Sequence, residues 1–315
     1  MPGSGFLKRE ISTSPNIFCC RNRGREKRNA FILCDTFSAR MKDNWHAQRA
    51  GKWTSYWRDE AHDPSAPYLL TECVEISGEK RKELELDVAE EESIKIILDG
   101  RHIVTFLALP RELRELAAGF LVCEGVLKGI GKIRSINVQE DTVFCESTLD
   151  TGELELWTEV RSSGCIGIKS SWEGIEPISS GVRMKKEVLM NAIEQIKEHG
   201  KLWRRTGGTH SSLICTSNGK IVSFCEDVSR ACSVDKAIGA ALLPGIDLSN
   251  CALVTTGRLS GGMVAKAARA GIPVVVSKAA PLSTGVVLSR RIGMTLVAFV
   301  RKPNLYVYSG EERIA

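Results

Sequence analysis

Apolar residues recur in two patterns along the C-terminal third of the chain. Short apolar runs predict strands at 211–216, 221–225, 251–255, 273–276, 295–300 and 305–308. Between several of these runs, apolar residues recur at helical spacing, which predicts helices at 232–243, 260–270 and 282–291. Because buried strands that alternate with helices form a sheet covered by helices, the pattern predicts an α/β layer.

The preceding region is richer in predicted strands. Residues 83–98 alternate between apolar and polar positions, and Asp99-Gly100 before the run 102–107 is typical of a hairpin. Pro110 then precedes apolar residues at positions i, i+3, i+4, i+7 and i+8 counted from Leu113, which predicts a helix. Further strands are predicted at 132–139, 142–147 and 153–159, a loop at 162–171 and a helix at 185–198.

Charge and composition set the first 68 residues apart. The chain has 315 residues and a net charge of +5, and residues 1–65 carry all of that excess. Since 1–68 shows no sustained period, we predict a disordered basic extension there, with a binding arm as the alternative. The rest is predicted as a β-rich part over 69–200 and an α/β part over 201–315. Its charges balance, so we expect no nucleic-acid partner.

Cysteine usage and hydropathy favour a cytoplasmic protein. Eleven cysteines at irregular spacing do not resemble a disulfide framework, and no secretory signal is recognisable. No apolar run reaches the ~18 residues that a membrane span needs, so we expect no membrane partner. No Cys-x-x-Cys pair occurs, and we therefore expect no protein-bound metal.

One cysteine lies in a setting that favours chemistry. Cys165 lies between Gly164 and Gly167, with Arg161 and Lys169 nearby. Small neighbours leave a sulfur accessible, and adjacent cations favour the thiolate over the thiol. A thiolate can attack the outer sulfur of a donor persulfide and then carry that sulfur itself. The alternative is one more small hydrophobic residue, which we expect for the cysteines in apolar runs.

Polar segments also lie where predicted elements begin or end, the positions at which α/β proteins bind ligands. Gly207 and Gly208 permit close approach of a ligand, and His210 could contact a phosphate or donate a proton. The alternative is a simple strand-entry turn. Arg258, before a predicted helix, suits an anion, or it is a surface residue beside a helix cap.

Charged residues at two further places allow both a functional and a structural interpretation. The pair Arg301-Lys302, between the last two predicted strands, suits a phosphate or a solvated edge. Asp227 and Asp235, near the helix predicted at 232–243, are equally consistent with helix caps and surface charges.

At these segments the chain resembles the formate dehydrogenase accessory sulfurtransferase (FdhD) family. The resemblance covers about residues 84–310. It is carried, in order, by the motifs at 117–125 (AAGFLVCEG), 206–211 (TGGTHS), 226–228 (EDV), 234–236 (VDK), 256–260 (TGRLS), 266–273 (KAARAGIP) and 293–301, and by Tyr306.

The resemblance implies a fold and an activity. The C-terminal part would be a cytidine-deaminase-like three-layer fold without the zinc ligands, and the protein would be a homodimer. It would move sulfur from a cysteine desulfurase to a substrate, the molybdenum (or tungsten) bis-pterin guanine dinucleotide cofactor, before insertion into formate dehydrogenase. The family's persulfide cysteine falls on Cys165. Cofactor contacts would be Phe299, Val300, Arg301, Lys302, Pro303 and Asn304, together with Gly207, Gly208, His210 and Arg258.

The chain departs from the family at two motifs. The family loop usually has two cysteines three apart, whereas here Ile168 or Gly167 holds the second place, depending on the register. The family also shows G-R-H-N where this chain has S-R-A-C, ending at Cys232. Our hypothesis is that Cys232, if it lies near the Cys165 loop, replaces the missing partner. The alternative is a buried cysteine at a helix start.

We therefore interpret the sequence as that of a sulfur carrier with Cys165 as the persulfide-bearing residue. The alternative is a cofactor-binding chaperone that holds the pterin dinucleotide and transfers no sulfur, because the second loop cysteine is missing. A zinc deaminase is disfavoured since neither of its ligand motifs is present.

Overall fold

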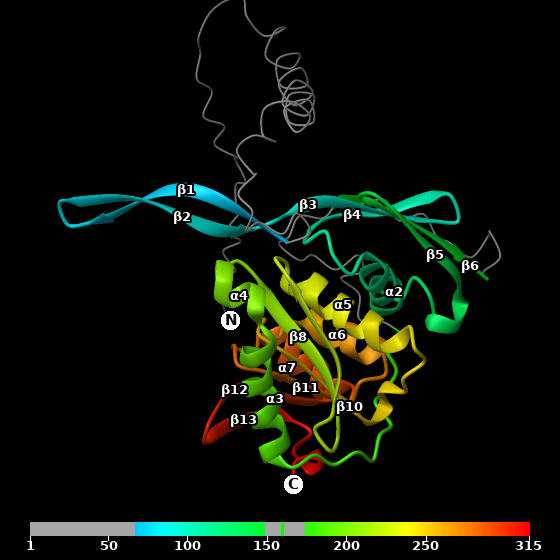
Figure 1. Ribbon diagram of the computed structural model, residues 1–315. Coiled ribbons are helices and arrows are strands. Elements are labelled where there is room, and N and C mark those ends of the chain that lie inside the picture. Colours follow the sequence, from blue (N-terminus) through cyan, green and yellow to red (C-terminus); the bar gives the residue numbers. More distant parts are fainter. Residues whose placement is uncertain (1–66, 149–158, 161–173) are drawn as a thin grey trace, which may run out of the picture. The chain divides into compact units, whose positions relative to one another are not determined.

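The computed structural model describes residues 67–148, 159–160 and 174–315, and only the backbone of 159–160 (Figure 1). The predicted extension up to residue 66 lies outside the described residues. So do the predicted loop at 162–171, which contains Cys165, and most of the predicted strand at 153–159. Residues Ser65–Ala315 form one compact unit.

The larger sheet has six strands in the order β13-β12-β11-β10-β8-β9. They are β8 (His210–Thr216), β9 (Ile221–Asp227), β10 (Cys251–Thr255), β11 (Val274–Ser277), β12 (Thr295–Arg301) and β13 (Asn304–Ser309). β10, β11 and β12 run parallel, whereas β8, β9 and β13 pair antiparallel with their neighbours. Every residue of β10 and β11 is buried, as expected for strands covered on both faces.

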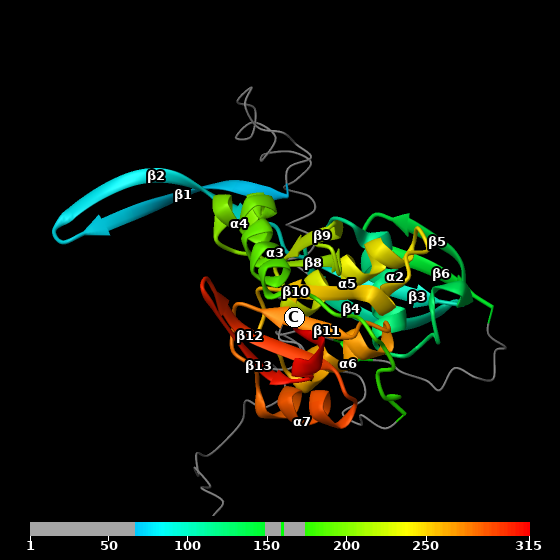
Figure 2. The ribbon, with the colours of Figure 1, turned by 90° about the horizontal axis from the view of Figure 1, so that it is seen from below.

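Helices cover both faces of this sheet, which gives three layers (Figures 1 and 2). α5 (Arg230–Leu242), α6 (Gly261–Arg269) and α7 (Ser283–Arg291) cover one face, and α3 (Lys186–His199) covers the other. The division follows the alternation of side chains along a strand, since Leu253 packs with α5 and α6 while its neighbours pack with α3. Although α3 falls in the segment predicted as β-rich, it belongs with the larger sheet.

A smaller sheet has five strands in the order β5-β6-β3-β4-β7. They are β3 (Glu92–Leu98), β4 (Arg101–Ala108), β5 (Ile133–Gln139), β6 (Thr142–Ser147) and β7 (Glu159–Val160). α2 (Leu113–Cys123) packs against this sheet and also crosses α5 closely. Glycines permit that crossing, because a Cβ on Gly119 would clash with the carbonyl of Asp235 and one on Gly239 with that of Glu115.

A two-stranded antiparallel ribbon stands at the start of the described residues. β1 (Tyr68–Ser77) and β2 (Lys80–Ala89) pair along their whole length. The short helix α4 (Lys201–Thr206) holds the base of the ribbon. Arg205 Nε in α4 donates to Asp87 Oδ2 at 2.6 Å, and the same guanidinium lies 4.2 Å from the centre of the Tyr68 ring.

The structure confirms the predicted α/β class, and most predicted elements have a counterpart with closely similar bounds. The stretch 83–98 differs, because it is divided between β2 and β3, which belong to different sheets. Neither β1 nor α4 was predicted. β1 is largely exposed and so lacks a clear apolar face, and α4 has only six residues, too few to show a helical period.

Candidate functional site

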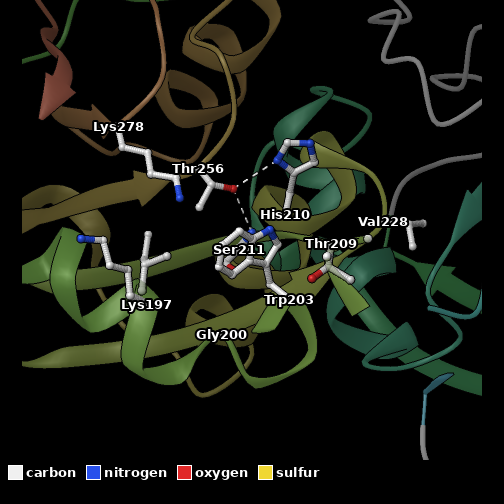
Figure 3. Close-up of a pocket in the computed structure, with 12 residues that line it drawn as sticks. Lys197, Gly200, Trp203, Thr209, His210, Ser211, Val228, Thr256 and Lys278 are labelled. Carbon is white, nitrogen blue, oxygen red and sulfur yellow. Dashed lines mark hydrogen bonds between the residues drawn. The ribbon is translucent and has the colours of Figure 1, made fainter. Parts of the chain in front are cut away.

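A cavity of about 260 Å³ lies where α4 ends and β8 begins, beside the carboxyl ends of β10 and β11 (Figure 3). α/β sheets commonly bind ligands outside the carboxyl ends of their parallel strands. The chain segments that meet here bring together residues far apart in the sequence. The lining includes Trp203, Gly207, Gly208, His210, Thr256 and Lys278.

Gly207 and Gly208 shape one wall of the cavity. Gly207 ends α4 with φ of +68°, the left-handed conformation that favours glycine, and its N–H donates to the carbonyl of Trp203 at 2.7 Å. The N–H of Gly208 donates to Thr206 Oγ1 at 3.1 Å, and a Cβ there would lie 3.2 Å from Cβ of Ala89. Both backbone donors are therefore engaged within the protein. The two glycines give the cavity its shape but leave anion binding to side chains.

A threonine holds His210 at the start of β8. His210 Nδ1 lies 3.1 Å from Thr256 Oγ1, which also accepts the backbone N–H of the next residue at 3.1 Å (Figure 3). Burial lowers the pKa of His210, and the charges of Arg230, Lys278 and Arg258 lower that pKa further. The imidazole is therefore neutral at neutral pH. Its Nε2 makes no hydrogen bond to any described residue, so it is available to a ligand.

Two lysines give the cavity a positive side. Lys197 from α3 and Lys278 after β11 both belong to the lining. Lys278 Nζ lies 5.2 Å from the centre of the Trp203 ring, within range of a cation–π interaction. Burial lowers the pKa of Lys278, and the charges of Lys197 and Arg301 lower it further. Lys197 pairs with Glu194 at 3.0 Å, so Lys278 is the lining cation whose charge is left to attract an anion. No motif in the sequence singles out these lysines or Trp203.

Glu226, at the end of β9, fixes the helix that carries Trp203. Its carboxylate accepts the backbone N–H groups of Leu202 and Trp203, each at 2.9 Å. Thr209 Oγ1 donates to the same carboxylate at 3.1 Å. A carboxylate at the first turn of a helix satisfies free N–H groups there. The charge of Glu226 is thus used to position α4.

Arg258 and Arg301, both predicted to face the ligand, lie beside the cavity and not in its lining. Arg258 is exposed in the turn after β10, and Arg301 is exposed at the end of β12. Their charges nevertheless reach the lining, because Arg258 lowers the pKa of His210 and Arg301 that of Lys278. The turn with Arg258 leads into α6, which is capped by the Ser260 hydroxyl. The helix cap considered as the alternative is therefore present.

The predicted cofactor segment 299–304 forms the turn between β12 and β13 and lies outside the cavity lining. Phe299 has φ of +52°, which is uncommon for a residue with a side chain, and its ring packs edge-on against Tyr306 at 6.2 Å. Lys302 Nζ donates to Asn191 Oδ1 in α3 at 3.0 Å. The Val300 side chain is 1% exposed within the core beneath α3, so the prediction that it contacts a cofactor is wrong for that side chain. The other predicted contacts are exposed: Phe299, Arg301, Lys302, Pro303 and Asn304.

Six of the seven described cysteines are buried. Cys165 lies outside the described residues, so its role stays a prediction. Cys232 is 2% exposed near the start of α5, and burial, followed by the charge of Asp227, raises its pKa well above the usual range. A buried protonated thiol is a poor nucleophile, so the structure favours the buried alternative for Cys232. The cysteines expected in apolar runs are buried as predicted: Cys123, Cys215, Cys225 and Cys251.

Asp227 and Asp235 are core residues, so the interpretation of them as surface charges is wrong. Asp227 Oδ2 lies 2.8 Å from Lys236 Nζ, and both side chains are 0% exposed. Lys266 Nζ lies 2.8 Å from Asp235 and 2.8 Å from Glu124. These five residues form ion pairs that α5, α6, the end of β9 and the residue directly after α2 bring together. The spacing of charged residues within one helix does not show ion pairs between different elements.

The described ranges lack the features of two further classes of site. They contain no group of three or more His, Cys, Asp or Glu side chains placed to hold a metal ion. Within the same ranges, no helix has both the length and the apolar character needed to cross a membrane.

Known proteins resemble this chain over most of its length. The profile of the FdhD/NarQ family matches residues 89–315. The sulfur carrier protein FdhD of Methanothermobacter thermautotrophicus is 32% identical over 249 residues, covering 78% of this chain and 98% of its own. That of Wolinella succinogenes is 31% identical over 233 residues, covering 71% and 81%. A solved structure of a formate dehydrogenase accessory protein from Desulfotalea psychrophila gives a TM-score of 0.67 at 30% identity, covering 79% of this chain and 100% of that one.

Proposed function

The chain belongs to the FdhD/NarQ family, and on that premise we propose that it is a sulfur carrier. It accepts sulfur on Cys165 from a cysteine desulfurase. It delivers that sulfur to the molybdenum (or tungsten) bis-pterin guanine dinucleotide cofactor used by formate dehydrogenase. The observation that carries the proposal is the sulfur-carrier identity of relatives that match most of this chain. A cytoplasmic homodimer belongs to the same proposal.

Loading of Cys165 is an exchange between a thiolate and a persulfide. The Cys165 thiolate attacks the terminal sulfur of the desulfurase persulfide. A new S–S bond forms at Cys165 while the S–S bond of the donor breaks, and the donor cysteine leaves as a thiolate. The exchange therefore needs no external oxidant or reductant. Arg161 and Lys169, close to Cys165 in the sequence, favour its thiolate.

The cavity supports the delivery half of the proposal. Phosphate groups of the cofactor are anionic, and Lys197 and Lys278 line the cavity with Arg258 and Arg301 beside it. Guanidinium groups suit planar, bidentate contacts with phosphate. The volume of about 260 Å³ is below the ~300–1,000 Å³ typical of pockets that enclose a whole drug-sized ligand. The cavity therefore fits one end of the cofactor, and the exposed side chains of segment 299–304 offer a second surface.

A cofactor chaperone that transfers no sulfur is the second candidate. One observation favours it, namely that Cys165 has no second cysteine three residues away. Both candidates use the cavity, but only the sulfur carrier uses the thiol. A sulfur adduct on Cys165 therefore decides between them.

The test is intact-mass analysis of the full-length protein after incubation with a cysteine desulfurase and cysteine. We expect an adduct of one sulfur atom that a thiol reductant removes. The adduct is absent in Cys165→Ala and kept in the control variant Cys232→Ser. Cofactor binding with no adduct in the unmodified protein would overturn the sulfur-carrier proposal and favour the chaperone. An adduct that persists in Cys165→Ala would contradict the assignment of the carrier residue.

A further inference from the structure

The ribbon of β1 and β2 carries apolar side chains on one face. From Glu83 to Val88, β2 alternates between acidic and apolar residues, so its apolar side chains point to the same side of the ribbon. The register of the two strands places Leu69 and Cys73 of β1 opposite apolar residues of β2, on that same side. We call this surface the ribbon face. It consists of Leu69, Cys73, Leu84, Leu86 and Val88.

The ribbon face remains exposed although its apolar side chains adjoin one another. Leu86 is 53% exposed and Val88 is 49% exposed. No residue of the ribbon face belongs to a hydrophobic cluster within the described ranges. α4 contacts the base of the ribbon from the opposite side, where Tyr68 and Asp87 lie. Because burial of apolar surface is favourable, the ribbon face is available to another surface.

The ribbon has little support from the rest of the described chain. β1 and β2 have ten residues each, and they pair with no third strand among the described residues. Figures 1 and 2 show the tip of the ribbon extending away from the other two sheets. Because an isolated two-stranded ribbon is only marginally stable in water, a partner that covered the ribbon face would stabilise it.

Charge is distributed unevenly along β2. The strand begins near the tip with the cations Lys80, Arg81 and Lys82 and continues toward the base with the acids Glu83 and Glu85. None of these five side chains forms an ion pair with another described residue. When two such ribbons run antiparallel, the basic tip of one lies beside the acidic part of the other, whereas a parallel arrangement brings like charges together. The pattern of charges therefore complements a second copy of itself.

We propose that two copies of this chain associate through the ribbon face. The two ribbons pack antiparallel about a two-fold axis, so that each ribbon face covers the other and the charged residues of β2 lie at the rim. Two strands of ten residues approach the ~20–30 residues that each partner contributes to a stable interface. The inference rests on the homodimer in the proposed function, and it assigns the contact to the ribbon.

Sedimentation equilibrium of the full-length protein over a range of concentrations tests this assignment. We expect the unmodified protein to form a dimer. Leu86→Glu should weaken the dimer by about 100-fold, because a two-fold interface contains the position twice and an unpaired buried carboxylate costs about tenfold or more each time. The matched control is Val74→Glu, which changes a similarly exposed residue on the opposite side of the ribbon and should leave the dimer unchanged.

A charge reversal tests the antiparallel orientation. Lys82→Glu should weaken the dimer, because it places an acid beside the acidic part of the partner ribbon. Adding Glu85→Lys to the same chain should restore the affinity, since the reversed pattern again complements itself. Equal affinities of the single and double variants would overturn the antiparallel arrangement.

Three outcomes would overturn the assignment of the ribbon face to a second copy. The first is a dimer of Leu86→Glu as tight as that of the unmodified protein, which would place the contact on another surface. The second is that Val74→Glu dissociates as readily as Leu86→Glu, which would indicate a disrupted ribbon and not a lost contact. The third is a monomer in which amide exchange across residues 80–89 is slow at every dilution, which would assign the ribbon face to another segment of the same chain.

Sulfur loading separates this inference from the proposed function. Leu86 lies outside the cavity lining, so Leu86→Glu should still form the sulfur adduct on Cys165. An adduct on Cys165 in an unmodified protein that stays monomeric would defeat the inference and leave the sulfur carrier standing. A dimer that Leu86→Glu dissociates, in a protein that takes up no sulfur, would do the reverse.

Discussion

Lysines occur in two contrasting settings in this protein, paired in the core and clustered with other cations around the cavity. In the core, Lys266 Nζ lies 2.8 Å from Asp235 and 2.8 Å from Glu124, and Lys236 Nζ lies 2.8 Å from Asp227. Taking an ammonium group out of water costs several kcal/mol, and the neighbouring carboxylates offset that cost. The core lysines therefore serve the fold.

At the cavity, Lys197 pairs with Glu194 at 3.0 Å on the exposed side of α3, whereas Lys278 forms no ion pair with a carboxylate among the described residues. Lys278 is half-buried, and the charges that act on it come from Lys197 and Arg301. Water still reaches these groups, so the fold does not require a carboxylate beside them. An anionic ligand would supply the missing negative charge. The contrast teaches that a lysine neutralised by a buried carboxylate stabilises the fold, whereas a lysine without such a partner is available to an anionic ligand.

The strongest test of the contrast removes one core cation. Lys266→Met leaves Asp235 and Glu124 buried without their cation, and we expect the free energy of unfolding to fall by about 3–5 kcal/mol. Lys278→Met should change it by less than about 1 kcal/mol, because no ion pair is broken and only the cation–π contact with Trp203 is lost. Denaturation with guanidinium chloride measures both values. If the two variants had equal free energies of unfolding, the core lysine and the cavity lysine would not differ in their contribution to stability.

The core pair also predicts a dependence of stability on pH. Burial raises the pKa of Asp235 from 3.8 to about 6, against the attraction of Lys266. Between these values the folded protein binds more protons than the unfolded chain. The free energy of unfolding contributed by this group should therefore decrease as pH rises from about 4 to about 6. Denaturation at a series of pH values should show this decrease, and Asp235→Asn should lack it. An identical slope in the variant would contradict the assignment.

The cavity predicts a smaller pH effect, on binding. Neighbouring cations and burial keep His210 neutral, whereas a bound diphosphate would favour its protonated form. Affinity for GDP, a fragment of the proposed cofactor, should therefore increase a few-fold as pH falls toward the lowered pKa of His210, which lies below the ordinary histidine value of about 6.5. Calorimetric titration between pH 5 and 8, at roughly the limits of histidine titration, measures the effect. His210→Gln should show a flatter profile, and an unchanged profile would exclude His210 as its source.

The smallest effect is expected at the exposed arginines. Arg258 and Arg301 lie outside the cavity lining, where salt screens their charges. Arg258→Gln and Arg301→Gln should each weaken GDP binding by less than about tenfold, and the loss should diminish as ionic strength rises. Lys278→Met should weaken GDP binding more, and that loss should persist under the same conditions. If Arg258→Gln or Arg301→Gln weakened GDP binding more than Lys278→Met does, the anion would bind at the turns that carry these arginines and not in the cavity.

The secondary-structure elements around the cavity were easier to predict from the sequence than the side chains that meet in it. α5 was predicted because burying one helix face leaves a periodic trace in the sequence, and Gly207, Gly208 and His210 stand out at a strand entry. The contact between Trp203 and Lys278 joins segments that are distant along the chain, so no local pattern shows it. The ion pairs of Lys266 were not predicted for the same reason, because its carboxylate partners come from two other segments of the chain. The burial of the Val300 side chain was not predicted, because a motif match does not show which side chains face the core.

Transfer of radioactive sulfur would show whether position 165 carries it. A cysteine desulfurase and labelled cysteine would load the full-length protein, and the label would then be followed onto the cofactor. We predict that the unmodified protein takes up the label and passes it on, that Cys165→Ala takes up none, and that Lys278→Met takes it up but passes on less. If Cys165→Ala took up and delivered as much label as the unmodified protein, sulfur would not travel through this residue.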